Sequence, residues 1–238
     1  MGKNQEQDGR MKTQLIIFDF DGTLGDTRHM IVTTMQMTIA ELGLPKRSDA
    51  TCASTIGQPL VRCFGTLFPD LSGDDVQRCA DTYRKIFYEN LETIHPQTFP
   101  HVVETLSALK EQGFTLTIAS SRSHASLVQL TQDLGLSDCI SYLIGADNVE
   151  IAKPHPEPVL KTLEAMGFEA GQTLVVGDMA VDILMGANAG ARTCGVTWGN
   201  GTREDLEKAG ADFIINSIGE LIEIVNDDES TRNMNKIH

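Results

Sequence analysis

The sequence predicts an α/β fold in which a parallel sheet core is interrupted, after its first strand, by an inserted all-helical segment. From residue 100 onward, short apolar runs typical of buried strands alternate with amphipathic stretches of helical period. Residues 27–98 hold helical patterns and no strand pattern. Strands that alternate with helices pair in parallel through right-handed crossovers, which place helices on both faces of the sheet. Such a sheet binds ligands at the carboxyl ends of its strands, and the helical segment is expected to lie over these ends.

The first part of the chain holds one strand and the helical segment. An apolar run at residues 14–18 ends in an acidic turn and predicts a buried strand. Gly43 ends the first helix that follows, and Ser72 starts the third with a capping-box pattern. These helices are expected over residues 28–42, 58–68 and 72–90.

The rest of the chain alternates between helices and strands. Gly113 and Gly135 end two of the helices, because glycine readily takes the left-handed backbone conformation that closes a helix. The expected strands cover residues 115–119, 142–144, 173–176, 193–197 and 213–215. The expected helices cover residues 102–112, 123–134, 156–166, 181–189 and 218–225.

These elements define the expected domain organisation. Residues 11–26 and 99–226 form the sheet core, and residues 27–98 form the helical cap. The polar stretches 1–10 and 227–238 are expected to be disordered tails, since polar chain ends without packing partners fray.

The composition narrows the range of partners. The chain has 238 residues, enough for one packed core and a second small module, and a formal net charge of −14. A negative surface repels nucleic-acid phosphates and anionic membranes, so neither is an expected partner. The sequence contains no apolar run of the length that a membrane span needs, and the spacing of its five cysteines is not typical of a metal site. We expect a reduced, cytoplasmic protein that acts on a small molecule, as a monomer or a dimer.

Four polar clusters fall where expected strands end or in the turns that follow them. Because carboxyl ends of parallel strands share one crevice, we expect these clusters to meet. Two carboxylates about 4 Å apart repel by roughly 4 kcal/mol at an effective dielectric constant near 20. A lysine and a hard divalent cation such as Mg²⁺ would balance this charge. The clusters are Asp19 to Leu24, Ser120 with Ser121, Lys153 with Pro154, and Gly177 to Asp182.

The residue types in these clusters suit the hydrolysis of a phosphate ester. With the cation bound, Asp19 can attack phosphorus and form an aspartyl-phosphate. Asp21 can protonate the leaving oxygen and later deprotonate the attacking water. Gly22 permits a tight turn that directs backbone N–H groups toward the phosphate, and Ser120 is placed to hydrogen-bond a phosphate oxygen.

The motifs resemble those of the haloacid dehalogenase superfamily, and the resemblance spans residues 14–225. It implies a Rossmann-like sheet with a helical cap. By this resemblance Asp19 is the nucleophile and Asp21 the general acid/base, while Ser120 and Lys153 correspond to the residues of the second and third motifs.

The resemblance also implies how Mg²⁺ is held. The expected ligands are the side chain of Asp19, the backbone carbonyl of Asp21 and the side chain of Asp178. Asp182, the second acid of the fourth motif, is expected to act through water or as support.

Within the superfamily the chain is most similar to the phosphoglycolate phosphatase group. The similar stretches are Thr55 to Leu60, Lys153 to Pro158, and Val196 to Leu206. Two stretches depart from that group: Ser120-Ser121-Arg122 replaces Thr-Asn-Lys, and Pro100-His101 replaces Pro-Gly. These departures touch the phosphate pocket and the hinge, so the resemblance leaves the substrate open.

Further side chains are candidates for contact with the substrate. For Arg122 and Arg62 a position on the solvent-exposed surface is an equally good interpretation. The candidates are Gly22, Thr23, Ser121, Arg122 and Arg62.

The sequence therefore predicts a Mg²⁺-dependent phosphatase of a small phosphorylated metabolite, with phosphoglycolate suggested by the resemblance. An inorganic pyrophosphatase of the same fold would differ only in the leaving group, and a β-phosphoglucomutase would pass the phosphate to a sugar. A receiver-like phospho-acceptor module is the non-enzymatic alternative, but it needs neither Asp21 nor a cap. Dehalogenation is disfavoured, since a leaving halide needs no proton and Asp21 would have no task.

Overall fold

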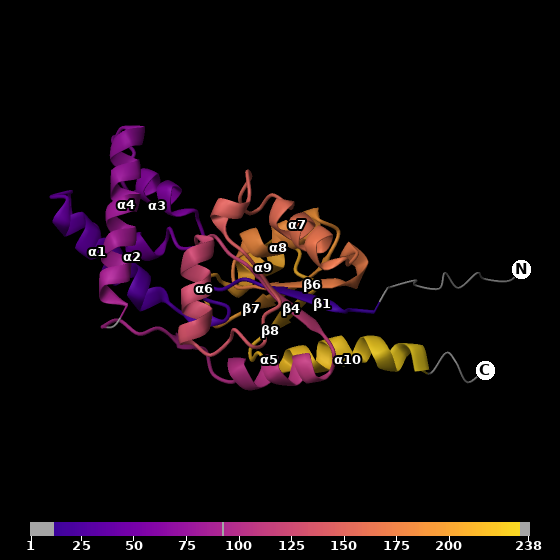
Figure 1. Ribbon diagram of the computed structural model, residues 1–238. Helices are drawn as coiled ribbons and strands as arrows, with labels where there is room; N and C mark the ends of the chain where they lie inside the picture. Colours follow the sequence, from indigo (N-terminus) through magenta and orange to yellow (C-terminus); the bar gives the residue numbers. More distant parts are fainter. Residues whose placement is uncertain (1–11, 92, 234–238) are drawn as a thin grey trace, which may run out of the picture.

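A six-stranded sheet forms the centre of the fold (Figure 1). The computed structural model describes residues 12–91 and 93–233. The strands lie in the order β5-β4-β1-β6-β7-β8, and every neighbouring pair is parallel. The predicted α/β class with a Rossmann-like parallel sheet is confirmed. The strands are β1 (Leu15–Phe18), β4 (Thr115–Ala119), β5 (Tyr142–Ile144), β6 (Thr173–Gly177), β7 (Arg192–Val196) and β8 (Phe213–Ile215).

The register of the central strands sets where the polar clusters lie. Strand β1 lies between β4 and β6, and its last residue Phe18 pairs with Ile118 and with Val176. The three strands therefore end at nearly the same level. The residues that follow them emerge at one edge of the sheet, as parallel strands require.

Helices cover both faces of the sheet (Figure 1). One face of β1, with Ile16 and Phe18, packs on α5, α6 and α10, and the other, with Leu15 and Ile17, packs on α7 and α8. Because successive strand residues point to opposite faces, a strand covered on both sides reads as a continuous apolar run. The helices are α5 (Val102–Glu111), α6 (His124–Asp133), α7 (Glu157–Met166), α8 (Ala180–Asn188), α9 (Arg203–Lys208) and α10 (Glu220–Asn233).

Residues 27–98, called the helical insertion below, lie beside the sheet at the left of Figure 1. Helix α1 packs on α2 and α4, and α3 packs on α4. Ser48 starts α2 by accepting a hydrogen bond from the backbone N–H of Thr51. The helices are α1 (Arg28–Glu41), α2 (Asp49–Ala53), α3 (Leu60–Leu67) and α4 (Gly73–Asn90).

Two chain segments connect the insertion to the sheet core, and they pair with each other. Strand β2 (Gly25–Asp26) runs antiparallel to β3 (Gln97–Thr98), with Gly25 opposite Thr98 and Asp26 opposite Gln97. The expectation of no strand in residues 27–98 is therefore wrong for β3. A two-residue strand leaves no periodic pattern in a sequence, which explains why it was not predicted.

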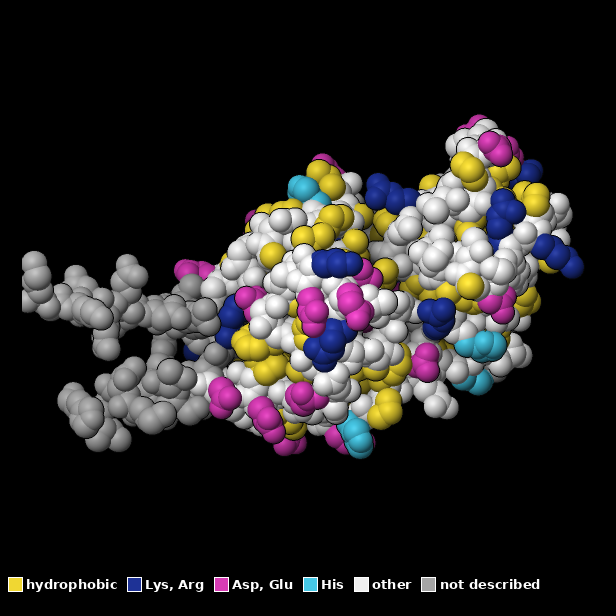
Figure 2. All heavy atoms as spheres, turned by 180° about the vertical axis from the view of Figure 1, so that it is seen from behind, with side chains coloured by type: hydrophobic (Ala, Val, Ile, Leu, Met, Phe, Trp, Pro, Cys, Tyr) yellow, Lys and Arg dark blue, Asp and Glu magenta, His cyan; other side chains and the backbone are white. Residues whose placement is uncertain are grey.

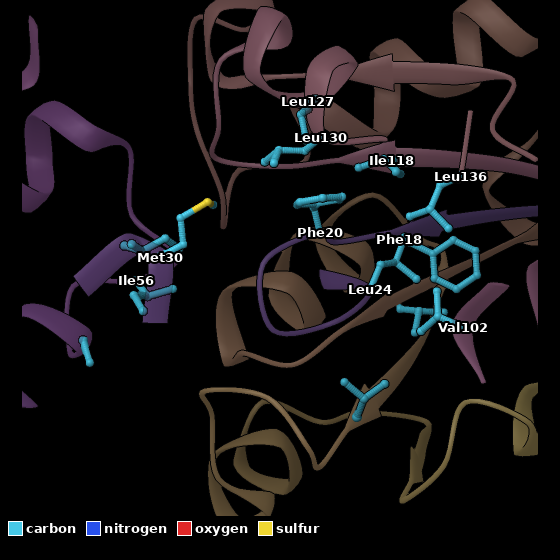
Figure 3. Close-up of a cluster of buried hydrophobic side chains, with 14 of the residues drawn as sticks. Phe18, Phe20, Leu24, Met30, Ile56, Val102, Ile118, Leu127, Leu130 and Leu136 are labelled. Atoms are coloured by element: carbon cyan, nitrogen blue, oxygen red, sulfur yellow. The ribbon is translucent and has the colours of Figure 1, made fainter. Parts of the chain in front are cut away.

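The core continues from the sheet into the insertion. Phe18 and Val102 belong to the same buried cluster as Met30 and Ile56, which come from the insertion (Figure 3). Phe20, two residues after the end of β1, is fully buried in this cluster. The sheet edge and the insertion are therefore joined by apolar packing as well as by the two connecting strands.

The C-terminal helix is longer than expected. Helix α10 runs to Asn233, although residues 227–238 were expected to be a disordered tail and the helix was expected to end at residue 225. The expectation for residues 1–10, and for 234–238, lies outside the described residues. The short helical turns Ala146–Asn148 and Ala170–Gln172 and the helix α2 were also not predicted.

The surface carries charges of both signs. Figure 2 shows acidic and basic side chains interspersed over the face it draws. Within residues 12–91 and 93–233, no helix combines the length and the apolar character that a membrane span requires.

Candidate active site

Lys153 lies between two buried carboxylates at the edge of the sheet. Its Nζ is 2.5 Å from Oδ1 of Asp19 and 2.7 Å from Oδ1 of Asp182. All three side chains are at most 10% exposed, so water screens their charges little. Burial disfavours the charged lysine, but the carboxylates of Asp182 and Asp19 outweigh this effect and raise the pKa of Lys153. Lys153 is therefore a fixed cation in the site.

Asp19, Asp178 and Asp182 form an acidic cluster with more negative charge than Lys153 balances. One carboxylate oxygen from each lies within 4.8 Å of the other two. Burial, assisted by Asp182 and Asp178 and opposed by Lys153, raises the pKa of Asp19 well above its ordinary value. Burial and Asp182 likewise raise the pKa of Asp178 to about 7. Carboxylates in this arrangement fit a hard divalent cation such as Mg²⁺, which would relieve their repulsion.

The local backbone places each acid of this cluster. Asp19 follows β1 and Asp178 follows β6, which pairs with β1 in parallel. Asp182 lies in the first turn of α8, where its Oδ2 accepts a hydrogen bond from the N–H of Met179 at 3.0 Å. Gly177 makes room for it, because a Cβ there would lie 2.3 Å from the Cβ of Asp182. One oxygen of Asp182 thus caps its own helix, while the other holds the lysine.

Two loops close around Asp178. Asn200 donates to Oδ2 of Asp178 from its backbone N–H at 2.6 Å and from its side-chain amide at 3.3 Å. Thr23, expected to contact substrate, is fully buried, and its hydroxyl donates to Oδ1 of Asp178 at 3.3 Å. Gly22 and Gly199 allow this approach, since a Cβ on either would lie 2.3 Å from Oδ2 of Asp178. These contacts orient the carboxylate of Asp178 within the acidic cluster.

The side chain of Asp21 turns toward the helical insertion. Its Oδ1 accepts a hydrogen bond from the hydroxyl of Thr27 at 2.5 Å, and Nε of Arg122 lies 2.8 Å from both of its oxygens. Thr27 holds the N-cap position of α1, but its side chain makes no capping bond. Among the described residues, the side chain of Asp21 is not a member of the acidic cluster. The metal contact expected for Asp21 therefore depends on its backbone carbonyl.

A cavity of about 310 Å³ lies between the helical insertion and the edge of the sheet. Asp21, Ser121 and Arg122 line it from the side of the sheet. Apolar and aromatic side chains of the insertion, among them Tyr83 and Phe87, line the opposite side. The proposed general acid therefore faces a largely apolar space that is partly open to solvent.

The other predicted contacts fall in different places. Ser120 is buried at the end of β4, and its hydroxyl accepts a hydrogen bond from the N–H of Arg122 at 3.3 Å. Ser121 donates to the carbonyl of Gly57 in the insertion at 2.7 Å. Arg62 is exposed on α3 and does not line the cavity, a position that favours its interpretation as a surface residue over the expected substrate contact. For Arg122 the surface interpretation is wrong, because its side chain is only 9% exposed.

Several residues of the site were not predicted. Tyr83 and Phe87 stand one helical turn apart in α4, and in the sequence such a pair looks like any core-facing pair. The contact of Thr27 with Asp21 and that of Asn200 with Asp178 join loops that no periodic pattern describes. The one available signal is the Gly199-Asn200-Gly201 turn, where two glycines allow a close backbone approach.

Comparison with known sequences gives matches over most of the chain. The family described as haloacid dehalogenase-like hydrolase matches residues 16–196. The protein named "Probable phosphatase IndB" of Dickeya dadantii is 36% identical over 210 residues, which cover 87% of this chain and 91% of that protein. The pyrophosphatase PpaX of Bacillus pumilus is 31% identical, over 90% of this chain and 96% of its own length. The phosphoglycolate phosphatase of Aquifex aeolicus is 32% identical, over 78% of this chain and 85% of its own length.

Comparison with solved structures gives the same fold. The crystal structure described as a predicted phosphoglycolate phosphatase from Haemophilus somnus matches with a TM-score of 0.83. The match covers 91% of this chain and 99% of the chain in that crystal structure, at 24% sequence identity.

Proposed function

Because this chain belongs to the haloacid dehalogenase-like hydrolase family and is, like its relatives, a phosphatase, we propose that it hydrolyses a small phosphomonoester with Mg²⁺ through an aspartyl-phosphate on Asp19. The observation that carries this proposal is the position of Asp19. Its carboxylate lies within 4.8 Å of those of Asp178 and Asp182 and shares the ammonium of Lys153. A nucleophile, a cation site and a fixed positive charge are thus adjacent.

Each residue of the site has a distinct role in this reaction. The carboxylate of Asp19 attacks phosphorus, and the bond from phosphorus to the leaving oxygen breaks. In its protonated form Asp21 gives a proton to the leaving oxygen, and as the resulting carboxylate it takes a proton from the water that cleaves the aspartyl-phosphate. Lys153 and Ser120 bind phosphoryl oxygens, and Lys153 remains charged throughout because of its carboxylate neighbours. Free phosphate and an alcohol are the products.

The acidic cluster would hold the metal ion. The side chains of Asp19 and Asp178 and the carbonyl of Asp21 are the proposed ligands, and Asp182 supports them through Lys153. Mg²⁺ bound there supplies positive charge that lets a dianionic phosphate approach the carboxylates. Asn200 and Thr23 keep the carboxylate of Asp178 in the orientation that binding needs.

The helical insertion is proposed to act as a cap over this site, with residues 11–26 and 99–226 as the core. Ser121 donates to the carbonyl of Gly57, so the insertion is docked on the sheet edge in this structure. A docked cap excludes water from the aspartyl-phosphate until the alcohol has left. The five buried, free cysteines support a reducing, cytoplasmic location, and the enzyme is proposed to act as a monomer or dimer.

Release of free phosphate tests the proposal. We expect the wild-type protein to release phosphate from phosphomonoesters only with Mg²⁺, and EDTA to stop the reaction reversibly. Asp19→Asn should release none while its circular dichroism is unchanged, and Asp21→Asn should be slowed roughly 100-fold or more. Near-normal turnover by Asp19→Asn would contradict the assignment of the nucleophile. Transfer of the phosphate to a sugar without release would identify a mutase instead.

Pyrophosphate hydrolysis is a second candidate, because the pyrophosphatase PpaX is among the similar proteins. Phosphoglycolate is the first ester to test, because a phosphoglycolate phosphatase is another. Comparing kcat/KM for the two compounds under the same Mg²⁺ concentration distinguishes these activities.

A further inference from the structure

The cavity beside Asp21 is where the alcohol part of a substrate must lie. An ester whose phosphorus faces Asp19 and whose leaving oxygen faces Asp21 directs its alcohol group into the space that Asp21 lines. That space is the cavity of about 310 Å³ between the insertion and the sheet edge. Pockets for small-molecule ligands begin at roughly 300 Å³, so the cavity suits a group larger than a two-carbon acid.

The wall formed by the insertion is apolar and partly aromatic. The rings of Tyr83 and Phe87 are stacked, with centroids 6.4 Å apart and planes inclined by 12°. Both side chains are at least nine-tenths buried. Aromatic faces of this kind bind flat rings through dispersion and the hydrophobic effect. The other apolar side chains that line the cavity on this side include Ile31, Met35, Ile56 and Leu60.

The charged side chains in the lining already have partners. Arg122 pairs with Asp21 at 2.8 Å. Arg84 bonds to Asp81 at 2.6 Å, and Asp147 accepts from the N–H of His124 at 2.7 Å. The described residues that line the cavity include only four charged ones, which are Arg122, Arg84, Asp21 and Asp147. A second anionic group in the substrate would therefore meet two arginines that each already have a carboxylate partner, Asp21 for Arg122 and Asp81 on the surface for Arg84.

One buried polar atom of a residue that lines the cavity has no partner. The side chain of Arg122 is 9% exposed, its Nε binds Asp21, and its Nη1 donates to Ser126 at 3.2 Å. Its Nη2 is buried and has no hydrogen-bond partner among the described residues. The guanidinium lies 5.4 Å from the ring centroid of Phe87 and 6.0 Å from that of Phe20. Buried N–H groups are nearly always bonded, so this nitrogen points to a missing acceptor.

We propose that the preferred substrates are phosphomonoesters whose alcohol part is an uncharged ring with a hydrogen-bond acceptor. The ring packs on Tyr83 and Phe87, and the acceptor binds Nη2 of Arg122. This inference rests on the proposed phosphatase function and adds the class of leaving group. It makes Tyr83, Phe87 and Arg122 the residues that determine specificity, and it ranks phosphoglycolate and pyrophosphate below ring-bearing esters.

A panel of phosphate esters tests the inference on the wild-type enzyme with Mg²⁺. The compounds are ethyl phosphate, benzyl phosphate, the phosphate esters of the three pyridylmethanols, phosphoglycolate and pyrophosphate. We expect kcat/KM for benzyl phosphate to exceed that for ethyl phosphate and phosphoglycolate by about 10-fold or more. At least one pyridylmethyl ester, which adds an acceptor nitrogen, should exceed benzyl phosphate.

The outcomes separate this inference from the proposed function. If phosphoglycolate or pyrophosphate is the best substrate, the enzyme is a phosphatase and the inference about the ring is wrong. If no compound releases phosphate although the protein is folded and Mg²⁺ is present, the proposed function itself fails. Binding of benzylphosphonate and methylphosphonate, measured by calorimetry, gives an independent readout. Equal affinities would overturn the inference.

Two substitutions locate the contacts. Phe87→Leu should raise KM for benzyl phosphate several-fold more than for ethyl phosphate. Arg122→Lys keeps the charge but lacks Nη2, so it should remove the advantage of the best pyridylmethyl ester over benzyl phosphate, beyond any common loss in kcat. An unchanged ratio in both variants would contradict the assignment. Should Phe87→Leu not fold, Ile56→Phe, which fills the cavity, should lower kcat/KM for ring-bearing esters selectively.

Discussion

Nε of Arg122 lies 2.8 Å from both carboxylate oxygens of Asp21, and both side chains line the cavity at the edge of the sheet. The guanidinium is only 9% exposed and the carboxylate 13%. A buried ion pair of this kind fixes the direction of both partners. Thr27 adds a second constraint, because its hydroxyl donates to Oδ1 of Asp21 at 2.5 Å. The proposed acid/base is thus oriented from the sheet by one residue and from the insertion by another.

We expect Thr27→Val to reduce kcat by about 10-fold, less than the roughly 100-fold or larger effect of losing a general acid. Valine has the shape of threonine but cannot donate to Asp21, so the carboxyl gains freedom to turn away. Thr27 is buried, and its side chain makes no helix-capping bond. Stopped-time phosphate assays with wild type and variant would measure the change. A variant as fast as the wild type would show that Arg122 alone orients the acid.

Removal of the ammonium of Lys153 should destabilise the folded protein. Lys153→Met leaves Asp19 and Asp182 facing each other without a cation, and breaking such a buried pair costs about 3–5 kcal/mol. Urea unfolding in EDTA measures the free energy of unfolding. Lys161→Met is the matched control, because Lys161 pairs with Glu157 on the surface, where ion pairs contribute little. Equal effects of the two substitutions would refute the electrostatic role of Lys153.

The stability of the metal-free protein should fall as the pH rises from about 4 to about 7. Burial and Asp182 raise the pKa of Asp178 from its ordinary value of 3.8 to about 7 in the folded state. Between these two values the folded protein binds more protons than the unfolded chain, so raising the pH favours unfolding. Mg²⁺ favours the ionised carboxylate, and the gain in Tm on adding Mg²⁺ should therefore grow with pH.

Thermal unfolding at about pH 5 and about pH 8, with EDTA or with excess Mg²⁺, measures this dependence. In Asp178→Asn, which cannot ionise there, the increase of the Mg²⁺ effect with pH should be smaller. A gain in Tm that is the same at both pH values in the wild type would show that Asp178 is already ionised without the metal.

Gly57→Ala should impair docking of the insertion. Gly57 has a φ of +92°, and a Cβ there would lie 2.5 Å from Sδ of Met179 across the interface. The carbonyl of Gly57 also accepts the hydrogen bond from Ser121. We expect kcat/KM to fall about 10-fold, because a displaced insertion would misplace the groups that bind and position the substrate.

Gly65→Ala is the control for this substitution. Gly65 lies in α3 of the same insertion, and a Cβ there would have no neighbour within 4 Å. Alanine favours a helix over glycine by about 1 kcal/mol, so the control should be active and slightly more stable. If both alanine variants keep full activity, the close approach of Gly57 to Met179 is not needed for docking of the insertion.

The acidic cluster could be predicted because its geometry follows from topology. Apolar runs identify β1 and β6, parallel pairing aligns their carboxyl ends, and Asp19 and Asp178 come directly after them. Lys153 was predicted to lie in the site because it comes shortly before β6 in the chain and because it matches the third motif of the family that the sequence resembles. The inferences for Asp19 and Asp178 need only the period of a strand and the direction of a sheet.

The cavity could not be predicted in the same way. Tyr83 and Phe87 follow the spacing of any buried helical face, and the sequence does not indicate that the space before them stays open. For Arg62 of α3 the sequence left a substrate contact and a surface position open, and the structure places it on the surface. Which side of a short helix faces the site depends on how the insertion packs on the core.

The antiparallel pair of β2 and β3 brings the two ends of the insertion together. Residues paired across such a ribbon have Cα atoms about 5 Å apart, a span that a two-residue turn can bridge. A shortened polypeptide joined at this ribbon would keep the six-stranded sheet together with Asp19, Lys153, Asp178 and Asp182 at its edge. It would lose the aromatic wall of α4. Under the proposed function, the residues that cleave the bond and those that select the leaving group therefore come from two different parts of the chain, which meet at this ribbon.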